Sequence, residues 1–339
     1  MTRTTPRRPA DVEALFPELA RYRRTATRLH PRPGTPGVRD SSVGGPLLWP
    51  AAEPWPMCIE PHKRRSGERV RDVRLRRRIL AEAWSRTPAP GERPGPTDEE
   101  RAVLDTLKRG RHAPWLGRTD PIPMAAVAQL YRRDIPDLVG GPADCDLLQV
   151  FWCPFDAHGG GHDMSLHLRW RRSADVRQVR EEQPEPVVVG HDGYVPEPCV
   201  LHPERVVEYE YIEQLPDGLA RRIAEWEGPE DDWEPDTITY ESDLSIAPGW
   251  KVGGFASWHT TGPATITCGP CGRALEPLLT VASSEWDGGT GSWTPLEDRP
   301  AADAMDANTP THVTVGRWGS LFILTCPAYP EHPHHLVIQ

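Results

Sequence analysis

The chain of 339 residues has few apolar residues and no long hydrophobic run. Apolar residues make up 37% of it, against the usual share of about 45–50%, so we expect part of the chain to pack poorly. One of the longest apolar runs, Ser320–Leu324, is far shorter than the ~18 residues that a membrane span needs. The N-terminal residues lead into no hydrophobic signal core. These features predict a cytoplasmic protein without a membrane helix.

Signatures of the common enzyme classes are also missing. The sequence has no Gly-x-Ser-x-Gly, phosphate-binding loop, His-Glu-x-x-His or paired-carboxylate pattern. Gly159–Gly161 is a glycine run after an expected strand, but the helix that a phosphate cradle requires does not follow it. The sequence therefore assigns no catalytic residue.

The cysteines do not indicate the disulfide framework of an exported protein. Without an export signal, cysteines are expected to be reduced or bound to metal. The chain has seven, which is an odd set: Cys58, Cys145, Cys153, Cys199, Cys268, Cys271 and Cys326. Thirteen histidines supply candidate nitrogen ligands.

The segment Cys268-Gly269-Pro270-Cys271-Gly272 is the strongest chemical signal. Two cysteines at this spacing in a tight turn direct both thiolates at one ion, and the following glycine permits the turned backbone. Cys326 ends a later expected strand, and histidines follow it at positions 332, 334 and 335. We predict a structural Cys₃His zinc site of Cys268, Cys271, Cys326 and, as the fourth ligand, His332.

Two other interpretations of these cysteines remain open. Cys-Gly-Pro-Cys is also the thioredoxin tetrapeptide, but that chemistry needs the first cysteine at a helix N-terminus. Here Pro277 follows closely, and Thr267 stands where thioredoxins place tryptophan. The other interpretation is a set of buried thiols in a β core.

The first half of the chain holds a looser set of the same residue types. Cys58, His62 and Cys153, with His158 or His162, occupy places equivalent to the zinc-site residues. A second metal site is one interpretation. Because single cysteine and histidine spacings are weak signals, we favour a decayed site with packed cysteines.

Charge is divided unevenly along the chain. The net charge is −10, but residues 1–112 carry 24 Lys/Arg against 14 Asp/Glu, and the remainder carries 15 against 35. Nine of the sixteen residues between positions 63 and 78 are basic, whereas residues 181–243 hold 19 acidic and three basic residues. Such asymmetry indicates either a charged partner or two halves that complement each other.

Periodicity predicts several elements. Residues 9–24 read as an amphipathic helix that Pro17 splits or kinks. Thr97 and Glu100 form a capping box for a helix over 97–108, and a further helix is expected near 217–226. Strands are expected at 124–131, 147–152 and 167–170, the last paired with 147–152.

The two halves of the chain share an ordered set of features. Val-Gly-Gly-x-x-x-Trp occurs at 43–49 and at 252–258, and a cysteine, an apolar strand and a strand ending in Cys-Pro follow in each half. This order predicts a mainly β, α+β fold of duplicated antiparallel β units. We expect an N-terminal helix and linker (1–40), a first unit (41–180) with a basic, partly disordered insertion (59–118), an acidic connector (181–249) and a second unit (250–339).

These motifs resemble two families. Ser41–Trp49, Val127–Leu130 and Leu147–Phe151 resemble the YwqG-like family, a domain of unknown function with Gly-Gly-x-Pro, Leu-Ala-Gln and Leu-Leu-Gln-Phe-Phe segments. The segment from Gly253 to Cys326, which contains Cys-x-x-Cys and Leu278-Leu279, is similar to the programmed cell death protein 2 family. That family has a glutamine after Leu-Leu, where this sequence has Thr280. The resemblance implies a mainly β fold of duplicated units and, from the second family, a chaperone of ribosomal proteins.

The remaining candidates concern binding. Thirteen tryptophans are unusual for this length, and Trp233, Trp286 and Trp293 lie in polar loops where exposed aromatics serve recognition. The basic run, with Arg76, Arg77 and Arg78, fits an acidic protein, a solvated surface or, less well, nucleic acid.

Together these features predict a non-catalytic cytoplasmic protein that binds a partner. The partner is expected to be a basic protein, captured in a chaperone-like manner by the acidic middle and second half. The alternatives are an immunity-type protein that neutralises a toxin, and a metal- or thiol-dependent enzyme that uses Cys268 and Cys271.

Overall fold

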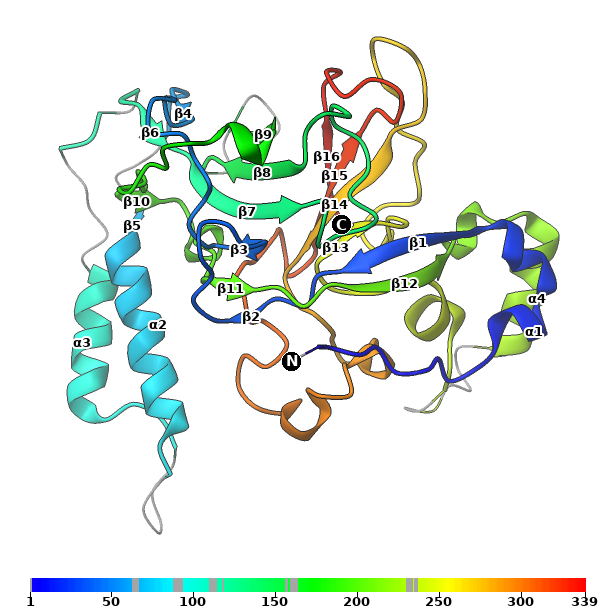
Figure 1. Ribbon diagram of the computed structural model, residues 1–339. Helices are drawn as coiled ribbons and strands as arrows, with labels where there is room; N and C mark the ends of the chain where they lie inside the picture. Colours follow the sequence, from blue (N-terminus) through cyan, green and yellow to red (C-terminus); the bar gives the residue numbers. More distant parts are fainter. Residues whose placement is uncertain are drawn as a thin grey trace.

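The protein has an α+β fold built around two six-stranded antiparallel sheets (Figure 1). The structure is a computed structural model. It describes residues 2–62, 67–87, 94–109, 115–117, 119–155, 158, 164–229, 234 and 237–339. No helix in these ranges is long and apolar enough to cross a bilayer.

The first sheet has the strand order β2-β11-β3-β7-β8-β9. Its long strands are the three that the sequence predicts, and β9 pairs with β8 as expected. Every residue of β8 is buried, because this central strand is covered on both faces. The bounds are β2 (Arg32–Pro33), β3 (Ser42–Val43), β7 (Ala125–Tyr131), β8 (Leu147–Trp152), β9 (Leu166–Arg171) and β11 (Cys199–Val200).

The second sheet has the order β12-β1-β13-β14-β15-β16. Its bounds are β1 (Arg23–Arg28), β12 (Glu204–Tyr209), β13 (Lys251–Gly253), β14 (Glu276–Ala282), β15 (Ser320–Thr325) and β16 (His335–Ile338). The register shifts between Pro277 and Leu279, as it does in the first sheet between Ala126 and Ala128.

One hydrophobic cluster joins the two sheets. It combines β7 and β8 residues such as Leu130 and Val150 with β14 and β15 residues such as Val281 and Ile323, all fully buried. In Figure 1 the strands β7 and β8 run across the view, whereas β14 and β15 run up it. The largest core of the protein therefore lies where the two sheets meet.

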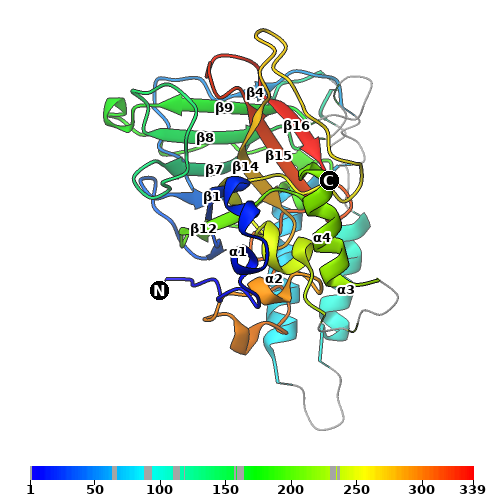
Figure 2. The ribbon, with the colours of Figure 1, turned by 90° about the vertical axis from the view of Figure 1, so that its right-hand side faces the viewer.

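The expected helix over residues 9–24 is wrong in its second half. Asp11 caps a short helix α1 (Val12–Leu15), and Pro17 begins a 3₁₀ turn (Pro17–Arg21), as its missing amide predicts. The chain then enters β1, where strand pairing on both sides outweighs the helical pattern. The predicted helix α4 (Asp217–Glu227) is confirmed, and it packs with α1 in a separate cluster (Figure 2).

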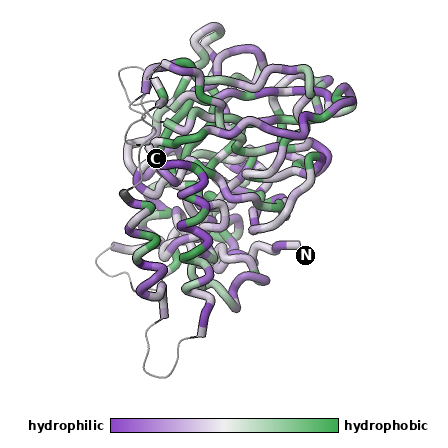
Figure 3. The backbone as a smooth tube through the Cα atoms, turned by 90° about the vertical axis from the view of Figure 1, so that its left-hand side faces the viewer, coloured by the Kyte–Doolittle hydropathy of each residue, from purple (hydrophilic) through white to green (hydrophobic). Residues whose placement is uncertain are grey.

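The basic insertion contains a helical hairpin that extends away from the sheets (Figures 1 and 3). Its helices are α2 (Val70–Ser85), which the sequence did not predict, and α3 (Asp98–Arg109). The capping box is confirmed, because the backbone N–H of Glu100 donates to Thr97 and the carboxylate of Glu100 accepts from the N–H of Thr97. The partial disorder expected within residues 59–118 stays a prediction.

Two separate short sheets of two strands each accompany this insertion. Two-stranded pairs join β4 (Met57–Cys58) to β6 (Ile122–Pro123) and β5 (Glu68–Arg69) to β10 (Val188–Val189). The described residues also form short helices, which are 3₁₀ turns at Ser173–Asp175, Asp192–Tyr194, Ile212–Gln214, Gly291–Trp293 and Arg299–Ala301, and a π-helix at Tyr240–Ser245.

The acidic segment complements the basic helix. Arg74, Arg76 and Arg77 of α2 form ion pairs with Glu185, Asp192 and Glu197 respectively. The same segment supplies β11 to the first sheet and β12 to the second. Part of the charge asymmetry is therefore used within the chain, and the segment expected as a connector is built into both sheets.

Candidate metal centres

The Cys-x-x-Cys segment forms a closed turn at the start of β14. The N–H of Gly272 donates to the carbonyl of Cys268 at 2.7 Å, and the N–H of Cys268 donates to the carbonyl of Arg273 at 2.7 Å. Gly272 has φ +69°, a conformation that favours glycine. This local geometry places both sulfurs on the same side of the turn, as the spacing predicts.

Two long-range elements complete the C-terminal tetrad, which we define as Cys268, Cys271, Cys326 and His332. Cys326 directly follows β15, which pairs with β14, and His332 lies in the turn beyond it. The Sγ atoms of Cys271 and Cys326 are 3.6 Å apart, and Cys268 Sγ lies 3.1 Å from His332 Nδ1. All four ligand atoms lie within 4.8 Å of one another.

These separations are within about 0.5 Å of those that a tetrahedral zinc ion would set. With Zn–S of about 2.3 Å and Zn–N of about 2.0–2.1 Å, the edges of the tetrahedron are about 3.8 Å between sulfurs and about 3.6 Å between sulfur and nitrogen. A disulfide would need sulfurs about 2.05 Å apart, and all seven cysteines are free thiols. The C-terminal tetrad could therefore bind a metal such as zinc, with the four residues that the sequence predicts.

The pKa values of two thiols in this tetrad, Cys326 and Cys268, are shifted in opposite directions. Burial raises the pKa of Cys326, but N–H groups of Ala328 and Tyr329 and the side chains of His332 and Cys271 outweigh it and lower that pKa to about 7. Burial and the neighbouring sulfurs raise the pKa of Cys268 to about 11. Thiolates this close repel one another, and a dication would relieve that repulsion.

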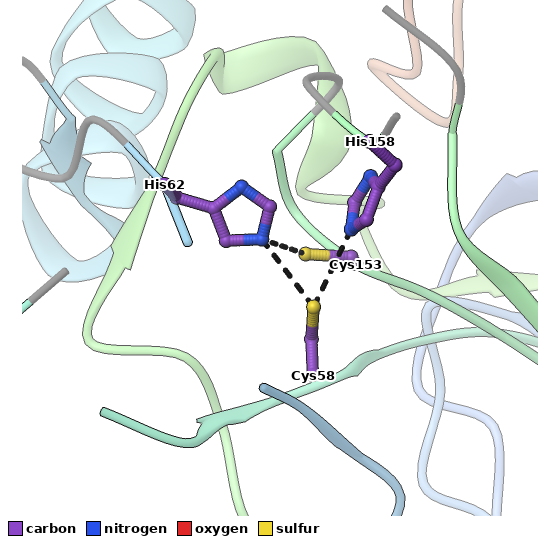
Figure 4. A group of neighbouring side chains, drawn as sticks. All are labelled: Cys58, His62, Cys153 and His158. Atoms are coloured by element: carbon purple, nitrogen blue, oxygen red, sulfur yellow. Dashed lines mark hydrogen bonds between the residues drawn. The ribbon is translucent and has the colours of Figure 1, made fainter. Parts of the chain in front are cut away.

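A second cluster, the N-terminal tetrad, consists of Cys58, His62, Cys153 and His158 (Figure 4). Cys58 ends β4 and His62 follows four residues later, whereas Cys153 directly follows β8 and His158 comes five residues after it. His162, the alternative ligand in this loop, lies outside the described residues.

The side chains of the N-terminal tetrad converge on one point in Figure 4. The Nε2 atom of His62 lies 3.3 Å from the Sγ atoms of both Cys58 and Cys153, and Nε2 of His158 lies 3.4 Å from Sγ of Cys58. The four ligand atoms again lie within 4.8 Å of one another. This tetrad could also bind a metal such as zinc.

The two tetrads have different surroundings. All four residues of the N-terminal tetrad are buried, and the ring of His62 stacks on Phe155 with centroids 4.9 Å apart. Cys58 and Cys153 belong to an apolar cluster with Trp55 and Phe151. In the C-terminal tetrad, Cys271 and His332 are partly exposed.

The structure places the other candidates differently from the sequence analysis. The expectation of exposed recognition tryptophans is wrong for Trp286 and Trp293, because both are buried beside arginine side chains. Their loops fold back onto the second sheet, which the local polar sequence cannot reveal. Trp233 lies outside the described residues.

Of the three candidate arginines, two form ion pairs within the chain and one is exposed. Arg76 pairs with Glu68 and Asp192, and Arg77 pairs with Glu197 and donates to nearby carbonyls, so both are used within the chain. Arg78 is exposed. The described part of α2 therefore offers little free positive charge to a nucleic acid.

The surroundings of Cys268 do not resemble a thiol-redox site. The Cys-x-x-Cys turn leads into β14, whereas a lowered thiol pKa in thioredoxin-like chemistry depends on a helix N-terminus. Burial instead raises the pKa of the first cysteine. Comparison of the sequence with protein-family models and with curated proteins finds no match.

Proposed function

We propose that this chain is a cytoplasmic, non-catalytic binding protein whose C-terminal half is held together by a structural zinc ion. The observation that carries the proposal is the C-terminal tetrad, in which three thiols and one imidazole lie within 4.8 Å of one another. Structural zinc sites have four protein ligands, whereas catalytic sites leave one position to water. An ion held there would join the Cys-x-x-Cys turn, the end of β15 and the C-terminal turn.

We further propose that the two halves are duplicated β units, related to the YwqG-like and programmed cell death protein 2 families. The strand orders β3-β7-β8-β9 and β13-β14-β15-β16 support this, because corresponding strands follow the same sequence order. Each unit has a register shift in its second strand and a tetrad cysteine directly after its third. Chaperone-like binding is what the second resemblance implies.

The proposed partner is a basic protein. Some acidic residues of 181–243 are used inside the chain, but that stretch has 19 acidic residues against three basic ones. Glu213, Asp217 and Glu225, on and beside α4, are exposed. A surface with unpaired negative charge attracts a positively charged partner, and salt weakens such attraction.

Affinity purification of the tagged chain at low salt tests this partner. We expect a stoichiometric basic protein that salt releases and that the charge-reversed variant Asp217→Lys/Glu225→Lys no longer retains. The matched control is Glu99→Lys/Asp105→Lys, which reverses two exposed charges on α3. Retention by both variants, or no partner above background, would contradict the proposal.

Metal analysis tests the structural role of zinc. Cys271→Ser should lose one zinc ion per chain and lower the stability of the C-terminal half, because structural metal binding contributes folding free energy. Cys145→Ser removes a thiol outside both tetrads and should change neither quantity. A Cys271→Ser chain with full stability that has lost activity on a disulfide substrate would favour the thiol enzyme instead.

A further inference from the structure

We infer that the N-terminal tetrad is a second zinc site, a buried Cys₂His₂ centre that closes the base of the helical insertion. This inference goes beyond the proposed function and does not depend on it, since the residues belong to other loops. The sequence favoured a decayed site, because its spacings are weak. The structure instead brings the four ligand side chains, two cysteines and two histidines, to one point from two segments of the chain.

The geometry fits an ion. The three sulfur–nitrogen separations of 3.3–3.4 Å are close to the edge of about 3.6 Å that a tetrahedral zinc ion sets. Only three residues separate Cys58 from His62 and four separate Cys153 from His158, so each pair reaches the common point from a single short segment.

Burial and charge fit the same ion. Two thiolates cancel the charge of Zn²⁺ and two imidazoles are neutral, so a filled Cys₂His₂ centre has no net charge. Burying an uncompensated charge among apolar side chains is costly, and this tetrad is wholly buried beside Trp55, Phe151 and Phe155. The C-terminal Cys₃His set would keep one negative charge, and it is the tetrad that is partly exposed.

The site also has a structural purpose. His62 and Cys153 are 91 residues apart in the sequence, and Cys58 and His158 are 100 apart. The chain between them includes the α2–α3 hairpin, while β4–β6 and β5–β10 are pairs of only two residues each. A metal that closes so long a loop removes conformational entropy from the unfolded chain and stabilises the base of the insertion.

Counting zinc in the purified full-length chain tests the inference. We expect two ions per chain in the wild type, one in Cys58→Ser, one in Cys271→Ser and two in Cys145→Ser. The Cys271→Ser chain should keep the N-terminal ion, so a failure of the proposed C-terminal site is recognised separately. If the wild type binds one ion and Cys58→Ser binds one ion as well, the inference is overturned.

Cobalt substitution decides the matter where Cys58→Ser does not fold. Tetrahedral Co²⁺ with thiolate ligands absorbs in the near ultraviolet, and this charge-transfer absorption grows with the number of thiolates. His158→Cys replaces one ligand with another and should bind two cobalt ions with stronger absorption than the wild type. Absorption and stoichiometry unchanged from the wild type would show that residue 158 does not touch the metal, and would overturn the inference.

Discussion

The buried ion pair between Lys251 and Glu208 offers the sharpest prediction about stability. Lys251 Nζ lies 2.6 Å from Glu208 Oε1, across β1 in the second sheet, and the side chains are 1% and 0% exposed. Burial lowers the pKa of Lys251, and the facing carboxylate opposes that shift. We expect Lys251→Met to keep the volume of the side chain but to leave a carboxylate buried without its cation.

The magnitude follows from the hydrogen bonds that remain. Breaking a buried pair by removing one partner costs about 3–5 kcal/mol. Glu208 still accepts from the backbone N–H groups of Ala247 at 3.0 Å and Phe255 at 2.9 Å, so we expect the lower end, about 3 kcal/mol. That is a large part of a typical free energy of unfolding of about 5–15 kcal/mol.

Urea denaturation of the zinc-loaded chain at neutral pH measures this loss. Lys108→Met is the matched control, because Lys108 lies 3.8 Å from Asp105 and both side chains are well exposed; it should cost less than about 1 kcal/mol. Lys251→Met/Glu208→Gln should recover part of the loss by removing the stranded charge. A loss for Lys251→Met no larger than that of the control would refute the reasoning, since the carboxylate would then be hydrated.

Three further predictions concern the core and the metals. Gln149→Leu should lower the free energy of unfolding by about 1–3 kcal/mol in urea titrations, because it removes the donor to the carbonyl of Leu48 and to Oε1 of Gln129 and the acceptor for Nε of the buried Arg171; an unchanged midpoint would contradict it. Burial lowers the pKa of His30 to about 4 despite a hydrogen bond with Glu204. The unfolded state, with a histidine pKa of about 6.5, therefore binds more protons, and stability should fall as the pH drops from about 6.5 to 4, by up to about 3 kcal/mol. His30→Asn should flatten that part of the pH profile, and an unaltered profile would contradict the assignment. A chelator should remove zinc in two phases, with the C-terminal ion leaving first because its tetrad is partly exposed. Cys58→Ser, which keeps the C-terminal ion, should therefore lose its zinc faster than Cys271→Ser, which keeps the N-terminal ion. The opposite order of rates would contradict this use of the difference in burial.

Much of the local structure could be predicted from the sequence. The capping box of Thr97 and Glu100 fixes the start of α3 through contacts only three residues apart. The run at Leu147–Trp152, apolar except for Gln149, predicts β8 because a strand buried on both faces is made mostly of apolar residues. Each of these rules acts within a few residues, so no knowledge of the rest of the chain is needed.

The glycines of the Val-Gly-Gly motifs have a structural role. Gly44 has φ +63°, and a Cβ there would lie 2.6 Å from the carbonyl oxygen of Glu197. Gly254 has φ +72°, and a Cβ there would clash with the carboxylate of Glu208. The sequence predicts that the backbone turns closely here, but the neighbours that demand glycine come from distant segments.

Tertiary structure alone decided the partners of the charged and aromatic residues. Trp286 and Trp293 lie in polar segments and are nevertheless buried, and the arginines of α2 meet acids more than 100 residues later in the chain. Residues 23 and 24 belong to the expected helix but begin strand β1, because β12 and β13 supply backbone partners to this strand. Composition and periodicity describe a segment by itself and carry no record of what packs against it.

The two tetrads differ in the same way, because one contains a local motif and the other is formed by long-range contacts. The sequence determined the Cys268–Cys271 turn, since spacing and a following glycine are local properties. It proposed Cys326 and His332 because Cys326 ends an expected strand and histidines follow it. It undervalued Cys58, His62, Cys153 and His158, whose ligand atoms converge only when segments 91–100 residues apart meet. A metal site made by long-range contacts leaves each ligand looking isolated in the sequence, because the distance that matters is set by the fold and not by the spacing along the chain.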